Sequence, residues 1–323
     1  MASRYLVNKV VQAIGTVFLI IILNFVLFRM MPGSPDRVLL RNPNITAEVR
    51  EAARERWGLD DPLPVQLVDY MGATLRGDLG YSFQFQGLPV TEVLAGRLWP
   101  TLILFGLGEV IAIVFGLSIG AYSGWKRGGP VDYVGNGASL VLYSMPYFVI
   151  GMFVLGIFAT GLGWFPTNGM FDVGRQYDSV WQQLGDFGWH LALPVLTVAI
   201  GLIGQYSILM RASVIDTLGE DYVTTARAKG LTDGHVLRAH ALPNALLPAV
   251  TLIAINLGFV IGGAITVEVV FNWPGLGTLT VDAVSARDYP VLQGIFLLLS
   301  ISVVAANLVA DIRYGGLDPR VRA

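Results

Sequence analysis

The sequence contains no cysteine among its 323 residues, so the chain forms no disulfide and offers no thiolate to a metal ion. Charged residues are also scarce: they make up 14% of the chain, whereas a soluble domain carries roughly 25%. The formal net charge is only −2, which provides no basic excess for binding nucleic acid. What remains is a chain in which 54% of the residues are hydrophobic.

Residue patterns that bind nucleotides or metals are missing as well. None of the three lysines, Lys9, Lys126 and Lys229, follows a glycine, so the Gly-Lys dipeptide of a Walker A phosphate loop is absent. The three histidines do not form an H-E-x-x-H motif or another metal-binding spacing. We therefore expect no catalytic residue, no bound cofactor and no metal site in this chain.

The apolar residues are gathered into long runs. A membrane-spanning helix needs about 20 mostly apolar residues, and six segments meet this requirement: residues 10–28, 101–122, 138–162, 191–209, 246–267 and 291–310. This arrangement predicts an all-α integral membrane protein with six transmembrane helices. We treat residues 1–323 as a single transmembrane domain.

The distribution of lysine and arginine predicts the orientation, because short cytoplasmic loops are enriched in these residues. Basic residues precede the first span, follow the sixth, and occupy the loops after the second and fourth spans. The short loops on the opposite side hold only Arg175 and Arg287. Both termini and the segment 211–245 are thus predicted to be cytoplasmic, and the long segment 29–100 to be external.

Between the fourth and fifth spans lies a polar stretch, residues 221–248, with the sequence DYVTTARAKGLTDGHVLRAHALPNALLP. Tyr222, Ala226 and Lys229 recur at helical spacing, and Gly230 stands where a helix-ending glycine takes a positive φ. The small residues at 226, 228 and 230 would allow another protein to approach closely.

A second short helix should follow this turn. Thr232 or Asp233 is suited to cap it, and it is predicted to run to about Ala241 and to end at Pro243. The expected structure is a helix, a sharp corner and a helix, between two membrane spans.

The spacing of this stretch resembles the coupling loop of ABC-importer permeases, whose pattern is E-A-A, three residues, G, nine residues, I-x-L-P. Thr224-Thr225-Ala226, Gly230 and His240-Ala241-Leu242-Pro243 fall on those positions, with Thr224, Thr225 and His240 departing from the pattern. A-R-A-K-G-L at 226–231 resembles the dipeptide and oligopeptide branch. The resemblance assigns ATPase coupling to Tyr222, Thr224, Thr225, Ala226, Ala228, Lys229, Gly230, Leu231, His240, Leu242 and Pro243.

Two external stretches also resemble peptide permeases. They are G-D-L-G-Y-S at 77–82 and V-E-x-V-F-x-W-P-G-L-G at 267–277, the latter followed by R-D-Y-P-V. The long first external segment is typical of the larger-looped of the family's two permease types. Turn-forming glycines and aromatic residues that we expect to be exposed predict a contact with a solute-binding protein, through Gly77, Asp78, Tyr81, Trp273, Pro274 and Gly275.

Polar residues inside the apolar runs are candidates for the translocation path. Glu109 is the only ionisable side chain well inside the second span, and a carboxylate in a membrane is costly unless it has a function or a hydrogen-bonding partner. Asn256 and Glu268, in and at the end of the fifth run, are the other candidates. The second run also holds Gly116, Gly120 and Gly124, a spacing suited to close helix packing.

The resemblance implies half of an ATP-driven importer for peptides or peptide-sized solutes in a bacterial-type cytoplasmic membrane. It implies several partners: a second, non-identical permease subunit, two cytoplasmic ATPase subunits that bind the ATP and magnesium, an external solute-binding protein, and membrane lipid, but no nucleic acid. Two alternatives use the same residues differently. An ion-coupled secondary transporter would employ Glu109, and an intramembrane serine protease would employ Ser118 of the G-x-S-x-G match at 116–120 with a histidine.

Overall fold

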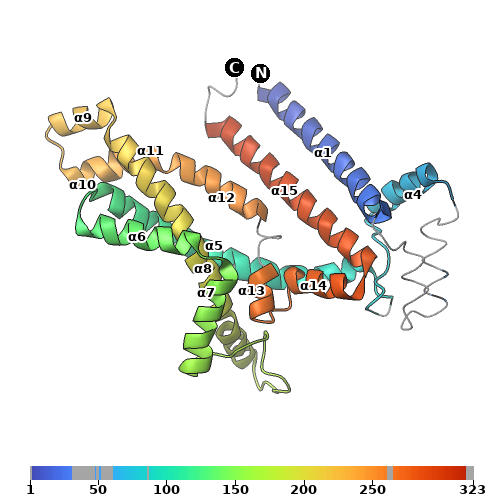
Figure 1. Ribbon diagram of the computed structural model, residues 1–323. Helices are drawn as coiled ribbons and strands as arrows, with labels where there is room; N and C mark the ends of the chain where they lie inside the picture. Colours follow the sequence, from blue (N-terminus) through green and yellow to red (C-terminus); the bar gives the residue numbers. More distant parts are fainter. Residues whose placement is uncertain are drawn as a thin grey trace. The chain divides into compact units, whose positions relative to one another are not determined.

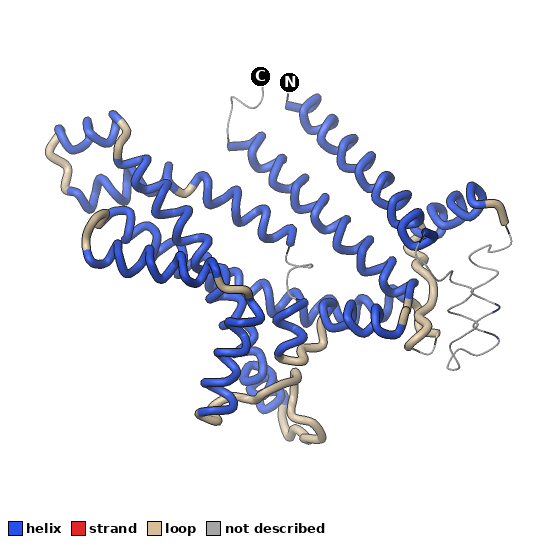
Figure 2. Tube along the Cα trace, viewed as in Figure 1, coloured by secondary structure: helices blue, strands red, loops and turns tan. Residues whose placement is uncertain are grey.

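The computed structural model describes residues 2–30, 48, 51, 61–85, 87–259 and 265–317. All regular structure in these residues is helical, and the only β-type pairing among them is an isolated bridge between Tyr81 and Pro89 (Figure 2). The all-α membrane fold expected from the apolar runs is confirmed. Most of the segment 31–60, which is predicted to be external, the Gly262 position and the last six residues lie outside the described residues.

The chain forms two compact units. The first comprises residues 1–101, 261–265 and 274–323, and the second comprises 102–260 and 266–273. The helix α5 (Val90–Trp125) contributes its first turns to one unit and its remaining turns to the other.

The first unit is built on α1 (Ala2–Met30) and α15 (Tyr289–Leu317), which run side by side (Figure 1). The short helix α4 (Leu63–Leu75) packs on α1, and α14 (Leu276–Ala286) packs on α15. The core of this unit joins Phe28 of α1, Val90 and Leu94 of α5, Leu279 of α14 and Ile295 of α15. Apolar side chains that point away from this core, such as Leu27 and Val309, are exposed, as expected for helices that face lipid.

The second unit is organised around α8 (Val180–Leu218), a 39-residue helix that packs against α6 (Pro130–Ser144), α7 (Tyr147–Val154) and α12 (Leu247–Phe259). It also holds α13 (Ile265–Val270). The glycine ridge of α5 lies against α8: a Cβ on Gly116 would meet Tyr206, and one on Gly120 would meet the Ser207 carbonyl. The close packing predicted from the glycine spacing is therefore confirmed.

The membrane helices are less regular than six uninterrupted spans. Four helices are long and apolar enough to cross a membrane, and two further pairs would each have to be counted as one bent span to reach six, among the residues described. The third predicted run is broken at Pro146, where α6 and the segment formed by α7 and the π-helix η1 (Leu155–Gly161) meet at 106°. Proline explains this break, because it cannot donate the backbone hydrogen bond that would continue α6.

Candidate functional site

The polar stretch after α8 folds as a helical hairpin. It consists of α9 (Asp221–Ala228), a turn at Gly230, α10 (Asp233–His235), the π-helix η2 (Val236–Ala241) and α11 (Leu242–Ala245). We call these residues, 221–245, the polar hairpin. In Figure 1 it forms the end of the second unit at which α8 stops and α12 begins.

The turn has the conformation that the sequence predicts. Gly230 has φ of 82°, in the left-handed region that glycine adopts without strain, and its N–H donates to the Arg227 carbonyl at 2.9 Å. Thr232 occupies the N-cap position of α10 with φ of −65° and ψ of 145°, but its side chain makes no capping hydrogen bond. The side chains of Arg227 and Asp233 approach across the turn, with Nε and Oδ1 3.5 Å apart.

The prediction that Pro243 ends the second helix is wrong. The chain continues from η2 directly into α11, with Pro243 in the first turn. The wider π-turn explains this continuation, because the Leu242 N–H donates to the Leu237 carbonyl five residues back. Pro243 then lies in the first turn of α11, where a backbone N–H has no partner within the helix and its absence costs nothing. The following α12 departs from this segment at 44°.

One side of the polar hairpin is buried against the chain itself. Val223 and Ala226 of α9 pack on Val236 of η2, and all three are nearly inaccessible to solvent. Leu237, Ala241 and Ala245 pack in turn on Met210 and Val214 of α8. The expectation that Ala226 lies open to a partner protein is therefore wrong, because its methyl group fills the inside of the hairpin.

Side-chain hydrogen bonds connect α9 to η2 and α11. The Asn244 Nδ2 donates to the Tyr222 hydroxyl at 2.8 Å and to the His240 carbonyl at 3.2 Å. The Tyr222 hydroxyl donates to the same carbonyl at 3.4 Å. Tyr222 and His240, both singled out from the sequence, thus belong to the internal framework of the hairpin, and Asn244 is a member that the sequence pattern did not reveal.

The opposite side of the polar hairpin is exposed. Among its exposed residues are Thr224, Thr225, Ala228, Lys229, Gly230 and Leu231, at and beside the turn, which we call the outward face; Arg227 and Asp233 are exposed next to them. Small side chains dominate this face, and a Cβ added at Gly230 would meet no atom within 4 Å. The turn therefore presents small side chains and Lys229, flanked by the exposed Arg227 and Asp233, above the buried layer of Val223, Ala226 and Val236.

A second group of predicted residues meets inside the helices. The carboxylate of Glu109 on α5 accepts a hydrogen bond from the hydroxyl of Tyr206 on α8, and the Asn256 Nδ2 on α12 donates to that hydroxyl at 3.0 Å. Glu109 is 2% exposed. Tyr206 is the member missed by sequence reasoning, since nothing in α8 alone marks it as a partner of a residue 97 positions away. Glu268, on α13, is fully buried as well.

Ser118 has none of the surroundings that a nucleophile requires. It lies within the regular helix α5, and its Oγ donates to the Val114 carbonyl four residues earlier at 2.6 Å. A serine hydroxyl in this bond satisfies the helix backbone and is not activated by a base. The protease alternative therefore has no structural support in the described residues.

The segment 77–85, which the sequence predicts to be external, is held in place by Asp288. The carboxylate accepts hydrogen bonds from the Ser82 hydroxyl at 2.5 Å and from the Phe83 and Gln84 N–H groups at 3.0 Å each. Asp288 is fully buried, just ahead of α15. Gly77, Asp78 and Tyr81 of this segment are exposed, as a contact surface requires. The sequence did not indicate Asp288 as their support.

The prediction of an exposed tryptophan in W-P-G-L-G is wrong. Trp273 is fully buried, with its ring centroid 5.8 Å from that of Phe187 on α8. Gly275 is buried at the N-cap of α14, and Pro274 is half-buried. The turn-forming residues around Trp273 led to the expectation that its side chain is exposed. The ring instead packs against Phe187, which lies almost 90 residues earlier in the chain. Trp273 and Gly275 are therefore not surface residues of this chain.

The helix that contains the predicted span 191–209 begins eleven residues earlier than that span. The helix α8 begins at Val180, so Asp186 and His190 are helical and buried. The Asp186 carboxylate accepts hydrogen bonds from the Tyr177 hydroxyl at 2.6 Å and the Asp172 N–H at 2.9 Å. Asp172, Asp186 and His190 come close enough to suggest a cation site. The Arg175 guanidinium already pairs with both carboxylates, at 3.0 Å from Asp172 and 3.6 Å from Asp186, so we propose no cation there.

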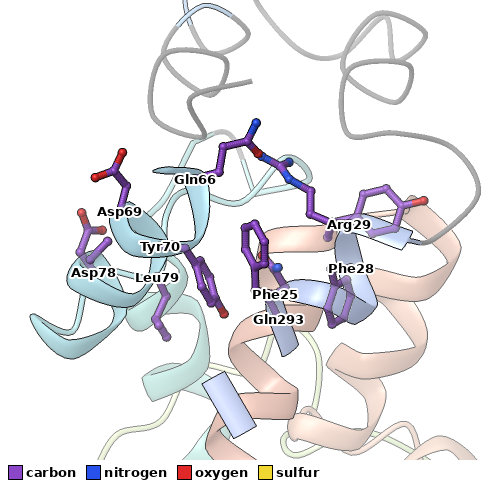
Figure 3. A pocket seen from close by; sticks show the side chains of 11 residues that line it. Phe25, Phe28, Arg29, Gln66, Asp69, Tyr70, Asp78, Leu79 and Gln293 are labelled. Carbon is purple, nitrogen blue, oxygen red and sulfur yellow. The ribbon is translucent and has the colours of Figure 1, made fainter. Parts of the chain in front are cut away.

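A small cavity lies in the first unit among α1, α4 and α15 (Figure 3). Its walls include the rings of Phe25, Phe28 and Tyr70, and Arg29 at its edge donates to the Gln66 side chain. The volume is about 60 Å³, which corresponds to about two water molecules. It is too small for a peptide, so we assign it to the packing of α4 on α1, where Phe25 and Tyr70 lie 5.6 Å apart.

Comparisons with known proteins agree with this architecture. Residues 112–323 match the family described as "Binding-protein-dependent transport system inner membrane component", and residues 2–104 match its N-terminal companion. A glutathione transport system permease protein of Salmonella typhimurium is 39% identical over 320 residues, covering 99% of each chain. A protein of Sinorhizobium fredii named "Probable peptide ABC transporter permease protein" is 38% identical over 318 residues, covering 98% of this chain and 99% of the relative.

Proposed function

Because this chain belongs to the family of binding-protein-dependent transport system inner membrane components, the multi-pass permeases of ABC importers, we propose that its polar hairpin receives the ATPase subunits. We propose further that the transported solutes are peptides or peptide-sized molecules. Membership in the family favours the importer over the ion-coupled transporter, and ATPase and binding-protein partners follow from it in general terms. The composition of the complex is part of the proposal: a second, non-identical permease and two ATPase subunits, with no catalysis by this chain.

The observation that carries the coupling proposal is the two-sided construction of the polar hairpin. A coupling element has to be rigid, because a flexible loop would absorb the movement of the ATPases instead of passing it to the membrane helices. Here Val223, Ala226 and Val236 bury the inner side, and the outward face remains free. The hairpin continues directly from α8 and leads into α12, so a force on it acts on two membrane helices.

The group Glu109–Tyr206–Asn256 supports a role along or beside the solute path. It links α5, α8 and α12, the last two of which flank the polar hairpin. A movement of α8 against α12 would break the hydrogen bond between the half-buried Asn256 amide and Tyr206, at a cost of about 0.5–1.5 kcal/mol. The hydrogen bonds of this group favour the observed arrangement over one in which α8 and α12 have moved apart, and alternating access requires such a difference in contacts between two states.

The proposed substrate class depends on the relatives. The names of two of them refer to glutathione and to peptides, and glutathione is itself a small peptide. Uptake of labelled dipeptides, pentapeptides and glutathione by cells that express the complete transporter tests this assignment. Uptake of none of them, in cells where the complex is assembled, would contradict it.

The docking of the ATPases is tested by labelling. The native chain has no cysteine, so Ala228→Cys on the outward face and Ser285→Cys on α14 report single exposed positions. We expect the ATPase subunits to protect position 228 from a maleimide reagent in detergent solution, because the outward face is covered, and to leave position 285 reactive. Equal labelling of position 228 with and without the ATPase subunits would contradict the proposal.

A further inference from the structure

An apolar groove runs between α5 and α6, with Ile203 of α8 as part of its lining. It has a volume of about 680 Å³ and belongs entirely to the second unit. Its walls are formed by Ile119 and Tyr122 on one side and by Val131, Val134 and Leu142 on the other. It lies along helices of a membrane protein, where the surrounding solvent is hydrocarbon.

Of the three serines along this groove, Ser118 and Ser139 are hydrogen-bonded within the helices, whereas the buried Ser123 hydroxyl has no hydrogen-bond partner among the described residues. Ser118 donates to the Val114 carbonyl, and Ser139 donates to the Gly135 carbonyl at 2.7 Å and accepts from the Ser207 hydroxyl at 2.8 Å. These hydroxyls are therefore committed, and a peptide or another polar solute would lose its hydration here with little in return. The chemistry of the groove fits a hydrocarbon chain.

The groove ends at the turn between α5 and α6, which has the composition of a membrane–water interface. Tyr122 and Trp125 meet edge to face at 5.9 Å, and the Lys126 Nζ stands 4.5 Å above the Trp125 ring. Aromatic rings next to basic side chains are typical of the level of the lipid headgroups. Lys126 and Arg127 are both exposed.

The single acidic group at this turn does not cancel those charges. The Asp132 carboxylate is buried and bonded to Arg211, with Nε to Oδ1 at 2.5 Å and Nη2 to Oδ2 at 2.8 Å. It also accepts a hydrogen bond from the Gly128 N–H at 2.9 Å. The positive charges of Lys126 and Arg127 therefore remain at the mouth of the groove.

From the apolar groove and its basic end we propose that this chain holds an anionic phospholipid. One acyl chain lies between α5 and α6, and the phosphate-containing headgroup contacts Lys126 and Arg127. Each basic residue near an anionic lipid surface contributes about 1 kcal/mol, and two together correspond to roughly 30-fold in affinity. If a second permease subunit covered this surface instead of a lipid, the two basic residues would have no role in binding. The test below distinguishes this case from lipid binding.

The test uses the full chain, purified in mild detergent with the subunits that remain bound to it. The sample is incubated with equal amounts of phosphatidylglycerol and phosphatidylcholine, and the retained lipid is identified by native mass spectrometry. We expect the wild type to retain phosphatidylglycerol with a preference of at least about ten-fold. The variant Lys126→Gln/Arg127→Gln should lose this preference. Arg76→Gln/Arg287→Gln, which removes two exposed positive charges elsewhere, should keep it.

A second pair of variants tests the acyl-chain site. Ala138 lines the groove, so Ala138→Phe should reduce retention of both lipids, whereas Val141→Phe, at an exposed position of α6 outside the groove, should not. The proposal is wrong if all variants retain lipid as the wild type does, or if the two double variants behave alike. It is also wrong if Ala138→Phe releases a subunit while lipid retention is unchanged, because the groove is then a protein interface.

Discussion

Asp288 shows how a single buried carboxylate organises the segment 77–85 of this permease. Three donors from residues 82–84 converge on it, and the charge is tolerated in a buried position because these hydrogen bonds replace its hydration. The residues proposed to meet the solute-binding protein, Gly77 to Tyr81, immediately precede the bonded residues. Asp288 therefore helps to fix their position relative to α15, together with Leu79, which packs against the core of the first unit.

Replacing this carboxylate with an amide should loosen the segment. In Asp288→Asn one oxygen becomes an NH2 group that faces N–H donors, and we expect a loss of about 2–3 kcal/mol in the free energy of unfolding. Thermal unfolding and limited proteolysis in residues 77–90 measure it. Asp282→Asn, at an exposed position of α14, is the matched control. If the two variants resist protease equally, Asp288 does not hold the segment.

Because Trp273 is buried, we expect its replacement to reduce the stability of the protein, whereas the sequence alone suggested a loss of contact with the solute-binding protein. Truncating a fully buried tryptophan removes its packing on Phe187 and leaves a cavity. We expect Trp273→Ala to lose about 3–5 kcal/mol of stability, seen as a lower yield of folded protein. Trp181→Ala, whose side chain is 82% exposed, should have little effect. A stable Trp273→Ala variant that fails only in its response to the binding protein would restore the surface interpretation.

At the scale of helices, the glycines of α5 allow this helix to pack closely on α8, because a side chain at these positions would collide with α8. A Cβ at Gly120 would meet the backbone of Ser207, which cannot rotate away. We expect Gly120→Ala to cost about 1–3 kcal/mol, whereas Gly137→Ala, with no atom within 4 Å of the new Cβ, should be neutral or slightly stabilising. Thermal unfolding in the same detergent compares them. Equal melting temperatures would mean that the two helices are not in contact at this seam.

Helices and turns were predictable where the controlling physics is local. Apolar runs of about 20 residues identify membrane helices, and Gly230 and Pro146 identify a turn and a break from their own backbone preferences. Trp273, Asp288 and Tyr206 were misjudged or missed because their environments are formed by residues far away in the chain. The continuation of η2 past Pro243 was also missed, since a π-turn leaves no clear trace in the sequence.

For the whole molecule, the orientation in the membrane remains a prediction from the basic residues. Thr232→Cys in the polar hairpin and Ser285→Cys on α14 are both exposed positions. On intact spheroplasts, an impermeant reagent should label position 285 and should reach position 232 only after the membrane is opened. The reverse pattern would place the polar hairpin outside, where no ATPase could reach it.

The central claim is that the polar hairpin couples ATP hydrolysis to transport, and Gly230 offers the most direct test. The positive φ at this position makes alanine strained by about 1 kcal/mol, so Gly230→Ala controls for the backbone. Gly230→Trp has the same backbone cost and adds a bulky ring to the outward face. ATP hydrolysis, retention of the ATPase subunits and solute uptake are measured in one proteoliposome preparation for each. We predict that Gly230→Ala transports nearly as well as the wild type, and that Gly230→Trp either loses the ATPases or hydrolyses ATP without uptake. Wild-type hydrolysis and uptake in Gly230→Trp would contradict the account.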